Sequence, residues 1–254
     1  MDMITLTTDF GDSEYVGALK GIIYSICPDA RVVDLTHSIR KFDIRHAAYV
    51  LHTVCRYFPK GTVHVVVVDP GVGTKRRGVI VKTEDFVFVG ADNGVFSLIY
   101  GIEEIFKITV ESKSKTFHGR DVFAPIAAKI ECGSTPEEFG TLITGIKKID
   151  FGKVKINEDD IEGEVFCIDY FGNVITNIKS EDFSKIGIES RKGVSLEIKN
   201  KKYELRFLES YGFAKKGELC CLFGSGGYLE MAVNQGDASK SLDVKGGEKV
   251  VIFR

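Results

Sequence analysis

The first half of the chain alternates short apolar, β-branched runs with amphipathic segments of helical spacing. Strand-like and helix-like segments follow one another at 4–8, 15–26, 32–35, 43–58 and 62–68, with further strand-like runs at 79–81 and 86–89. Such alternation predicts an α/β layer structure with a mostly parallel sheet. The run at 62–68 is apolar almost throughout, which predicts a central strand covered on both faces.

The pattern changes near residue 150. Charged side chains crowd residues 145–162, which contain few large apolar residues. Beyond them lie short strand signals, some separated by hairpin-like turns such as Lys199-Asn200-Lys201-Lys202. We therefore predict an α/β N-terminal domain at 1–150, a linker at 151–162, and a smaller all-β, barrel-like C-terminal domain at 163–254.

Charge and hydropathy exclude several classes of function. The 34 Lys and Arg against 36 Asp and Glu give a net charge of −2, which argues against a protein that binds nucleic acid through phosphate attraction. No apolar run approaches the ~20 residues that cross a bilayer, and the first residues lack the features of a signal peptide. The sequence predicts a cytoplasmic protein with no nucleic-acid and no membrane partner.

The cysteines and histidines show no metal-binding pattern. The cysteines are Cys27, Cys55, Cys132, Cys167, Cys220 and Cys221, and none lies in CxxC spacing. Because four of them fall inside apolar patterns, we favour buried free thiols over a zinc site or disulfides. No metal site is predicted.

Polar side chains follow several predicted strands, which is where α/β proteins bind ligands. Asp9 follows the first strand, and it either accepts hydrogen bonds from a vicinal diol such as a ribose or caps a helix. The loop that starts at Asp69 lacks the spacing of a phosphate loop, and it is either a ligand loop or a structural turn. Asn93 lies in a third loop, which a turn explains adequately.

Three later segments have two interpretations each. His118 precedes a helix-like run, where a lone histidine is more often structural than catalytic. Phe171 and Asn173 either stack on and hydrogen-bond a purine or belong to a strand with a bulge. Residues 224–227, with the sequence GSGG, either open a helix whose N–H groups hold a carboxylate or form a plain turn.

Taken together, five motifs resemble one known family. TTDFGDSEYVGALKG, VVDPGVGTKRRG, FHGRDVFAP, DYFGNVITNI and GSGGYLEMAVN occur in this order across essentially the whole chain. They are similar to the S-adenosyl-L-methionine hydrolases that form adenosine, the water-using relatives of fluorinase and chlorinase. The resemblance implies an α/β N-terminal domain, a C-terminal β-barrel, and a homotrimer. Its sites would lie between the N-terminal domain of one subunit and the C-terminal domain of the next.

The resemblance also implies roles for single residues. Asp69, Arg76 and His118 would form the catalytic set near the reacting water, with Arg76 taken over its neighbour Arg77 because of its offset from Asp69. The implied substrate-binding residues are Asp9 for the ribose, Phe171 and Asn173 for adenine, Asp169 for the methionine amino group, Ser225 for its carboxylate, and Phe10, Asn93, Phe117, Tyr228 and Val233. The sequence departs from the family at Asp169, whose spacing to Phe171 is one residue shorter.

The activity implied is hydrolysis of S-adenosyl-L-methionine to adenosine and L-methionine by in-line attack of an activated water on the ribose 5′ carbon. The only partner expected besides other subunits is this small-molecule substrate, with neither cofactor nor metal. Two alternatives remain: a non-catalytic protein that binds adenosyl ligands, and halide-dependent substitution on the same substrate. Gly119 stands where the halogenases have a halide-holding serine, which favours water over halide.

Overall fold

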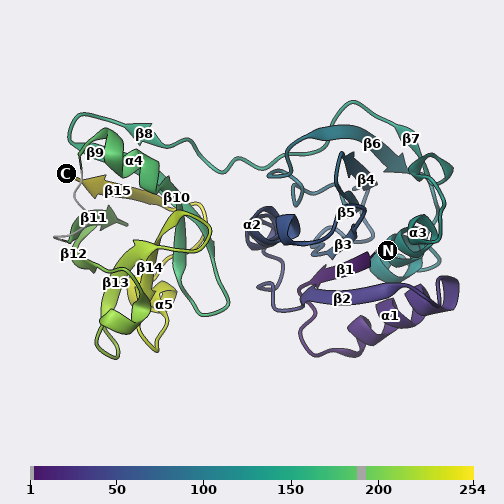
Figure 1. The fold of residues 1–254 in the computed structure, drawn as a ribbon, viewed down its shortest axis with the longest axis horizontal. Helices are drawn as coiled ribbons and strands as arrows, with labels where there is room; N and C mark the ends of the chain where they lie inside the picture. The colour runs from purple at the N-terminus through teal and green to yellow at the C-terminus, as the bar shows by residue number, and fades with distance from the viewer. Residues whose placement is uncertain (1–2, 188–192) are drawn as a thin grey trace. The chain divides into compact units, whose positions relative to one another are not determined.

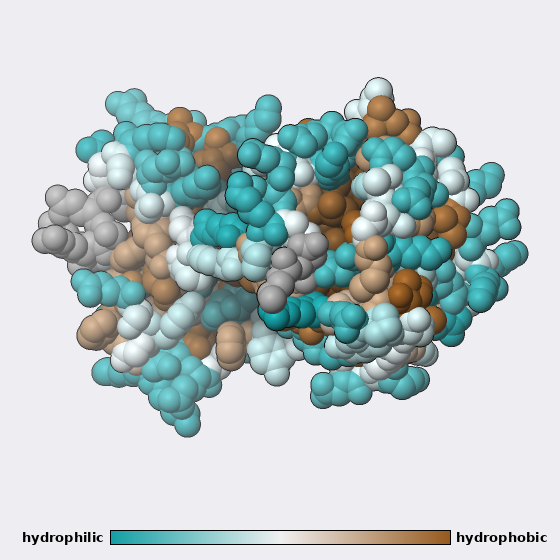
Figure 2. All heavy atoms as spheres, turned by 45° about the vertical axis from the view of Figure 1, so that its right-hand side comes forward, coloured by the Kyte–Doolittle hydropathy of each residue, from teal (hydrophilic) through white to brown (hydrophobic). Residues whose placement is uncertain are grey.

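A computed structural model describes residues 3–187 and 193–254 of the chain. The chain divides into two compact units, Met1–Ile149 and Asp150–Arg254, called here the N-unit and the C-unit (Figure 1). In the face shown in Figure 2, hydrophilic residues cover most of the surface and hydrophobic residues show in patches between them. Over the described ranges, no helix combines the length and the apolar character needed to cross a membrane.

The N-unit is built on a seven-stranded sheet of order β2-β1-β3-β5-β4-β6-β7. Its strands are β1 (Met3–Thr8), β2 (Arg31–Thr36), β3 (Val63–Val67), β4 (Gly78–Thr83), β5 (Val87–Ala91), β6 (Ile102–Ile108) and β7 (Gly140–Leu142). The first four in this order are parallel, whereas β4, β6 and β7 pair antiparallel. The prediction of a mostly parallel sheet was therefore wrong. Only residues 84–86 join β4 to β5, too few for the crossover that parallel strands need.

Helices cover both faces of this sheet. The helices are α1 (Glu14–Ile26), α2 (Ile44–Val54) and α3 (Ala124–Glu131), with short turns η1 (Cys55–Tyr57), η2 (Gly119–Phe123) and η3 (Pro136–Glu138). Leu19 of α1 and Ile126 of α3 pack in one core, and Leu51 of α2 packs in another. β3 supplies Val65 to the first core and Val66 to the second. This two-sided burial explains why the strand is apolar without alternation.

The C-unit is a β-barrel. Its strands have the order β10-β14-β13-β12-β11-β15-β9-β8, and a pairing of β10 with β9 closes seven of them into a ring. The elements are β8 (Lys155–Ile156), β9 (Asp160–Ile168), β10 (Val174–Lys179), α4 (Ser180–Lys185), β11 (Val194–Ile198), β12 (Lys201–Phe207), η4 (Tyr211–Phe213), β13 (Leu219–Phe223), β14 (Tyr228–Val233), α5 (Ala238–Leu242) and β15 (Lys249–Phe253). The predicted barrel is confirmed. Strand β8 and the start of β9 lie within the segment 151–162 that the sequence presents as a linker.

Two turns of the barrel decide between sequence interpretations. Lys199 and Asn200 join β11 to β12 with φ of 52° and 60°, the left-handed backbone of a two-residue hairpin turn, as predicted. Residues 224–227 join β13 to β14, with the N–H of Gly227 donating to the carbonyl of Gly224. The helix considered there is absent from this described segment, because the chain turns straight back into an antiparallel strand.

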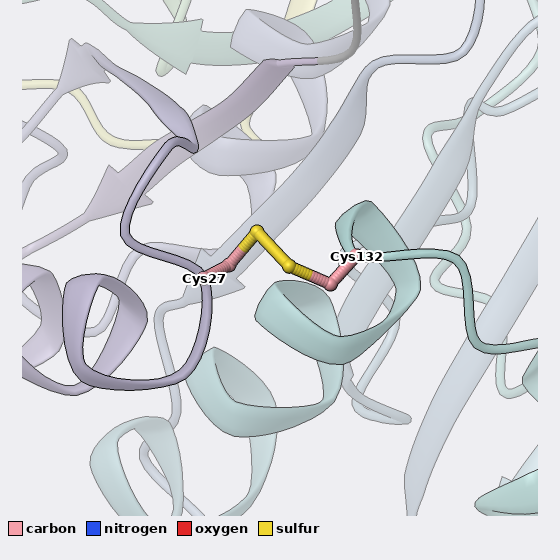
Figure 3. The surroundings of a disulfide bond; sticks show 2 residues. All are labelled: Cys27 and Cys132. Atoms are coloured by element: carbon pink, nitrogen blue, oxygen red, sulfur yellow. A yellow bond between two sulfur atoms is a disulfide. The ribbon is translucent and has the colours of Figure 1, made fainter.

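Cys27 and Cys132 form a disulfide, with their Cα atoms 6.0 Å apart (Figure 3). Cys27 follows α1 and Cys132 follows α3, so the bond joins the carboxyl ends of two helices that pack on the same core. The prediction of free thiols was wrong for this pair, because the chain separation of 105 residues carries no pairing signal. It was right for the other four cysteines, which are buried and form no disulfide.

Candidate functional site

Two acidic residues meet at the carboxyl edge of the N-unit sheet. β1 and β3 are parallel neighbours in which Thr8 pairs with Val67, so Asp9 and Asp69 both leave the sheet at this edge. Burial, and secondarily the charge of Asp69, raises the pKa of Asp9. The backbone N–H of Phe42 opposes that shift, because it donates to Oδ2 of Asp9 at 2.8 Å.

A cavity of about 150 Å³, the N-unit pocket, opens at this edge. It is lined by Asp9, Phe10, Phe42, Val67, Asp69, Val72, Thr116, Phe117, His118 and Gly119. Its aromatic wall is a cluster in which the rings of Phe10 and Phe117 meet edge to face at 5.9 Å. The cavity is smaller than the roughly 300–1,000 Å³ that encloses a drug-sized ligand, so it can hold only part of such a ligand.

Arg76 joins two of the pocket residues. Its Nε donates to Oδ1 of Asp69 at 3.0 Å, and its Nη2 donates to Oδ2. The same Nη2 lies 2.7 Å from Nδ1 of His118. Because a guanidinium can only donate, Nδ1 is the acceptor, and the neutral imidazole carries its proton on Nε2. Burial, together with the charge of Arg76, lowers the pKa of His118. His118 is therefore a neutral hydrogen-bond donor near pH 7.

The neighbouring arginine has other partners. Arg77 pairs through Nε with Asp92 and donates through Nη2 to the carbonyl of Gly145 at 2.8 Å. Its side chain is 37% exposed, against 10% for Arg76. Of the adjacent pair, Arg76 alone therefore contacts Asp69 and His118.

Other N-unit candidates divide into pocket residues and a supporting residue. Asp9, Phe10 and Phe117 line the pocket. Asn93 lies outside that lining: its Nδ2 donates to the carbonyl of Val68 at 2.9 Å, and its Oδ1 accepts from Val95. Asn93 thus fastens the end of β3, directly before Asp69.

The sequence reasoning missed Phe42. This residue lines the pocket, has a φ of 65°, and is 66% exposed. Left-handed backbone is strained for a large side chain, and such strain clusters at ligand sites. Exposed apolar surface is a second, separate sign of a binding site. The available signal was a phenylalanine inside the polar run SIRKFD.

The C-unit carries a separate cavity of about 380 Å³, the C-unit pocket. It is lined by Phe171, Asn173, Tyr211, Val233, Asn234, Gln235 and Gly236. Asp169 holds the turn that carries two of these residues, since Oδ1 accepts from the N–H groups of Phe171 and Asn173 and Oδ2 accepts from Asn173 Nδ2 at 2.9 Å. This turn leaves the ring of Phe171 72% exposed beside the cavity. Phe171 is thus free to stack on a planar ligand.

The remaining C-unit candidates belong to the β13–β14 hairpin. Ser225 is exposed in the turn, whereas Tyr228 is buried, with its ring 5.4 Å from that of Phe166. Val233 ends β14 at the C-unit pocket.

Glu230 is a second residue that sequence reasoning missed. It is 5% exposed, and Tyr211 donates to its Oε2 at 2.6 Å. Burial raises the pKa of Glu230, and the charge of Asp169 adds to that effect while Tyr211 opposes it. The turn is shaped around this carboxylate, because a Cβ at Gly224 would lie 1.7 Å from Oε1. The available signal was a glutamate between apolar residues in YLEMAV.

Comparisons with known proteins cover nearly the whole chain. Residues 4–140 match the SAM hydroxide adenosyltransferase N-terminal domain and residues 163–251 match the C-terminal domain of that family. A protein of Methanocaldococcus jannaschii named (R)-S-adenosyl-L-methionine hydrolase is 40% identical over 96% of this chain and 93% of its own length. A fluorinase of Actinopolyspora mzabensis is 23% identical over 99% of this chain and 97% of its own.

A solved structure has the same fold. The crystal structure of an uncharacterized conserved protein from Thermotoga maritima superposes with a TM-score of 0.89 at 38% identity. The match covers 99% of this chain and 100% of that one. Both units are therefore shared with a protein of known structure.

Proposed function

This chain belongs to the SAM hydroxide adenosyltransferase family, and on that premise we propose that it hydrolyses S-adenosyl-L-methionine to adenosine and L-methionine. The observation that carries the proposal is the Asp69–Arg76–His118 cluster at the N-unit pocket. The relative from Methanocaldococcus jannaschii is named for the R epimer at sulfur, and we propose the same epimer as the substrate of this enzyme.

In the proposed reaction a water oxygen attacks the ribose 5′ carbon in line with the carbon–sulfur bond. The bonding electrons pass to sulfur, so methionine leaves as a neutral thioether that needs neither a proton nor a metal ion. The positive charge moves to the new oxonium, which then loses a proton. Since a protonated alcohol is strongly acidic, a carboxylate is a sufficient base, and we assign that role to Asp69.

The other two residues of the cluster position the water and its acceptor. Arg76 occupies both oxygens of Asp69 and fixes the direction of its remaining lone pairs. The same arginine occupies Nδ1 of His118, which leaves Nε2–H to donate to the water oxygen. Catalysis then rests mainly on orienting water and excluding bulk solvent.

The rest of the substrate is assigned to residues of both units. Asp9 would accept the two ribose hydroxyls, and Phe171 would stack on adenine while Asn173 bonds its edge. Asp169 and Glu230 are acids suited to the methionine ammonium group, and the turn at Ser225 is suited to its carboxylate. The volume of the N-unit pocket supports this division, because about 150 Å³ has room for the reacting part alone.

Gly119 supports water over halide as the nucleophile. A Cβ at this position would lie 2.8 Å from Cγ1 of Val67 and 3.5 Å from Cδ2 of Leu19. The first contact belongs to the packing of η2 on β3 and the second to its packing on α1, so a serine of the halogenase type does not fit without moving the Val67 side chain. A halide-holding serine at this position therefore requires Val67 to shift, which favours water over halide as the nucleophile.

The proposal is tested by incubating the protein with each epimer of S-adenosyl-L-methionine, with and without chloride, and separating the products by chromatography. We expect adenosine and L-methionine from the R epimer, independent of chloride. A halogenated nucleoside would replace the proposal with halide substitution. If chromatography finds the substrate unchanged while calorimetry detects its binding, the protein is a binding protein rather than an enzyme.

We further propose a homotrimer in which each site takes its N-unit residues from one subunit and its C-unit residues from the next. Light scattering measures the mass directly. Asp69→Ala protein should lack hydrolysis, and Phe171→Ala protein should bind substrate more weakly. Mixing the two after mild dissociation would restore activity at low substrate concentration if subunits share sites, because some mixed sites contain neither substitution. Absence of recovery in a mixed trimer would contradict shared sites.

A further inference from the structure

A third strand end lies beside Asp9. In the sheet order β2-β1-β3, β1 has β3 on one side and β2 on the other, with Thr7 paired to Thr36. The residue after β2 is His37, which is thereby brought next to Thr8. Thr8, the last residue of β1, is therefore contacted from the β2 side, whereas Asp69 lies on the β3 side.

Four side chains, those of Thr8, His37, Asp34 and Lys20, follow one another at this point. Nδ1 of His37 lies 2.9 Å from Oγ1 of Thr8. Nε2 of the same ring lies 3.0 Å from Oδ1 of Asp34, an ion-pair distance without the alignment of a hydrogen bond. The second oxygen of Asp34 accepts from Nζ of Lys20 at 2.6 Å. A carboxylate beside Nε2 favours the proton on that nitrogen, which leaves Nδ1 to accept the hydroxyl proton of Thr8.

This series of side-chain contacts ends at the backbone around Asp9. With its proton directed to His37, Oγ1 of Thr8 accepts the N–H of Phe10 at 3.2 Å. The carbonyl of His37 accepts the N–H of Gly11 at 2.9 Å, and the carbonyl of Thr8 accepts from Ile39. The peptide that carries Asp9 is therefore fixed on both sides.

From this geometry we infer that Thr8 and His37, oriented by Asp34, are positioning residues that aim the carboxylate of Asp9 at the ribose diol. The inference rests on the proposed function, since it presupposes an adenosyl substrate. Thr8 is fully buried and lies outside the lining of the N-unit pocket, so it acts through Asp9 rather than on the substrate. A carboxylate that accepts two hydroxyls must be oriented closely, which is why fixing its backbone matters.

The test measures binding of adenosine and of 2′,3′-dideoxyadenosine by calorimetry, together with KM and kcat for hydrolysis. For Thr8→Val we expect adenosine to bind about tenfold more weakly, the scale of one lost charge-assisted hydrogen bond, with dideoxyadenosine unchanged. KM should rise by a similar factor while kcat changes little. Thr8→Ser keeps the hydroxyl and should restore wild-type values.

Two substitutions of His37 separate its contact with Thr8 from its contact with Asp34. In His37→Asn the side-chain oxygen can take the place of Nδ1, so we expect near wild-type discrimination between the two nucleosides. In His37→Gln the amide reaches toward Asp34 but leaves Thr8 without its acceptor, so we expect the Thr8→Val result. These variants keep the test decisive if Thr8→Val fails to fold.

Thr62→Val is the matched control. Thr62 is equally buried and donates one hydrogen bond, to the carbonyl of Pro59 at 2.7 Å, at the other end of the sheet. It should lower Tm without changing the discrimination between nucleosides.

A double variant tests whether Thr8 acts through Asp9. Adding Thr8→Val to Asp9→Ala should weaken adenosine binding no further, because the group being positioned is gone. Equal losses for both nucleosides, or a full additional loss in the double variant, would overturn the inference. Wild-type protein that binds neither adenosine nor S-adenosyl-L-methionine would instead overturn the proposed function.

Discussion

Arg76 contacts both Asp69 and His118, and it fixes the orientation of the first and the tautomer of the second. Its guanidinium holds the carboxylate of Asp69 by two hydrogen bonds and leaves His118 one possible tautomer. The side chains of this cluster do not act independently, because Arg76 bonds to both of the others and its removal would release Asp69 and His118 together. Substitutions here should therefore affect catalysis far more than binding of the product nucleoside.

Asp69→Asn keeps the shape of the side chain but removes its charge and its ability to accept a proton. We expect kcat to fall by about 10²- to 10⁴-fold, the usual contribution of a positioned base, with adenosine affinity within a few-fold of wild type. Asp92→Asn is the control, since Asp92 makes the equivalent pair with Arg77 away from the pocket. Full turnover by Asp69→Asn would remove this residue from the mechanism.

Phe171→Ala should weaken adenosine binding by ~1–3 kcal/mol, the value of one aromatic stack on a base. Calorimetry with adenosine measures the loss. Tyr57 provides the control, because it is 73% exposed against 72% for Phe171 but does not line the C-unit pocket. An equal effect of Tyr57→Ala would argue against stacking on Phe171.

At the level of elements, two helices follow segments that line the N-unit pocket and are tied at their far ends. α1 follows the loop of Asp9, and α3 follows His118 and the turn η2. Both helices pack on the same face of the sheet, and the disulfide joins the residues that end them. The bond therefore restrains the pair of elements whose amino ends border the N-unit pocket.

Reduction of Cys27–Cys132 should lower the free energy of unfolding of the N-unit by about 2–4 kcal/mol, because the bond closes a long loop in the unfolded chain. Urea titration with and without a phosphine reductant measures this difference. The double variant Cys27→Ser, Cys132→Ser should be destabilised to a similar degree and insensitive to the reductant. Equal sensitivity of wild type and double variant would show that the effect arises elsewhere.

At the level of the whole molecule, the free energy of unfolding should depend on pH because of a buried histidine. His64 lies on β3, fully buried, with Nδ1 2.7 Å from Oγ1 of Thr5 and its ring stacked 5.0 Å from Phe88. Burial lowers its pKa from 6.5 to about 4. Between about pH 6.5 and pH 4, the unfolded chain therefore binds a proton at His64 that the folded protein does not bind.

The free energy of unfolding should accordingly fall as pH drops from about 6.5 to about 4, by ~3 kcal/mol from His64 at the lower end. Above pH 6.5 this contribution to stability is fully present. Urea titrations at pH 7.5 and 4.5 measure the slope, which His64→Gln should flatten and the control His52→Gln should leave steep. Parallel slopes for wild type and His64→Gln would contradict the assignment.

The sequence by itself determined the features that repeat along the chain. Strand and helix periodicity gave the α/β unit and the barrel, because alternation and apolar runs record which faces are buried. It also placed Asp9 and Asp69 after parallel strands, and topology alone then brings them to one edge. The motifs identified the family because short segments keep their order and spacing.

Only the tertiary structure decided the contacts between distant residues. It gave Arg76 its contacts with Asp69 and His118, paired Cys27 with Cys132, and buried Glu230 beneath the Gly224 turn. It also turned half of the sheet antiparallel and closed the barrel through β9 and β10. The physical reason is the same in each case: side-chain direction and strand pairing depend on packing between segments far apart in the chain, which no local pattern records.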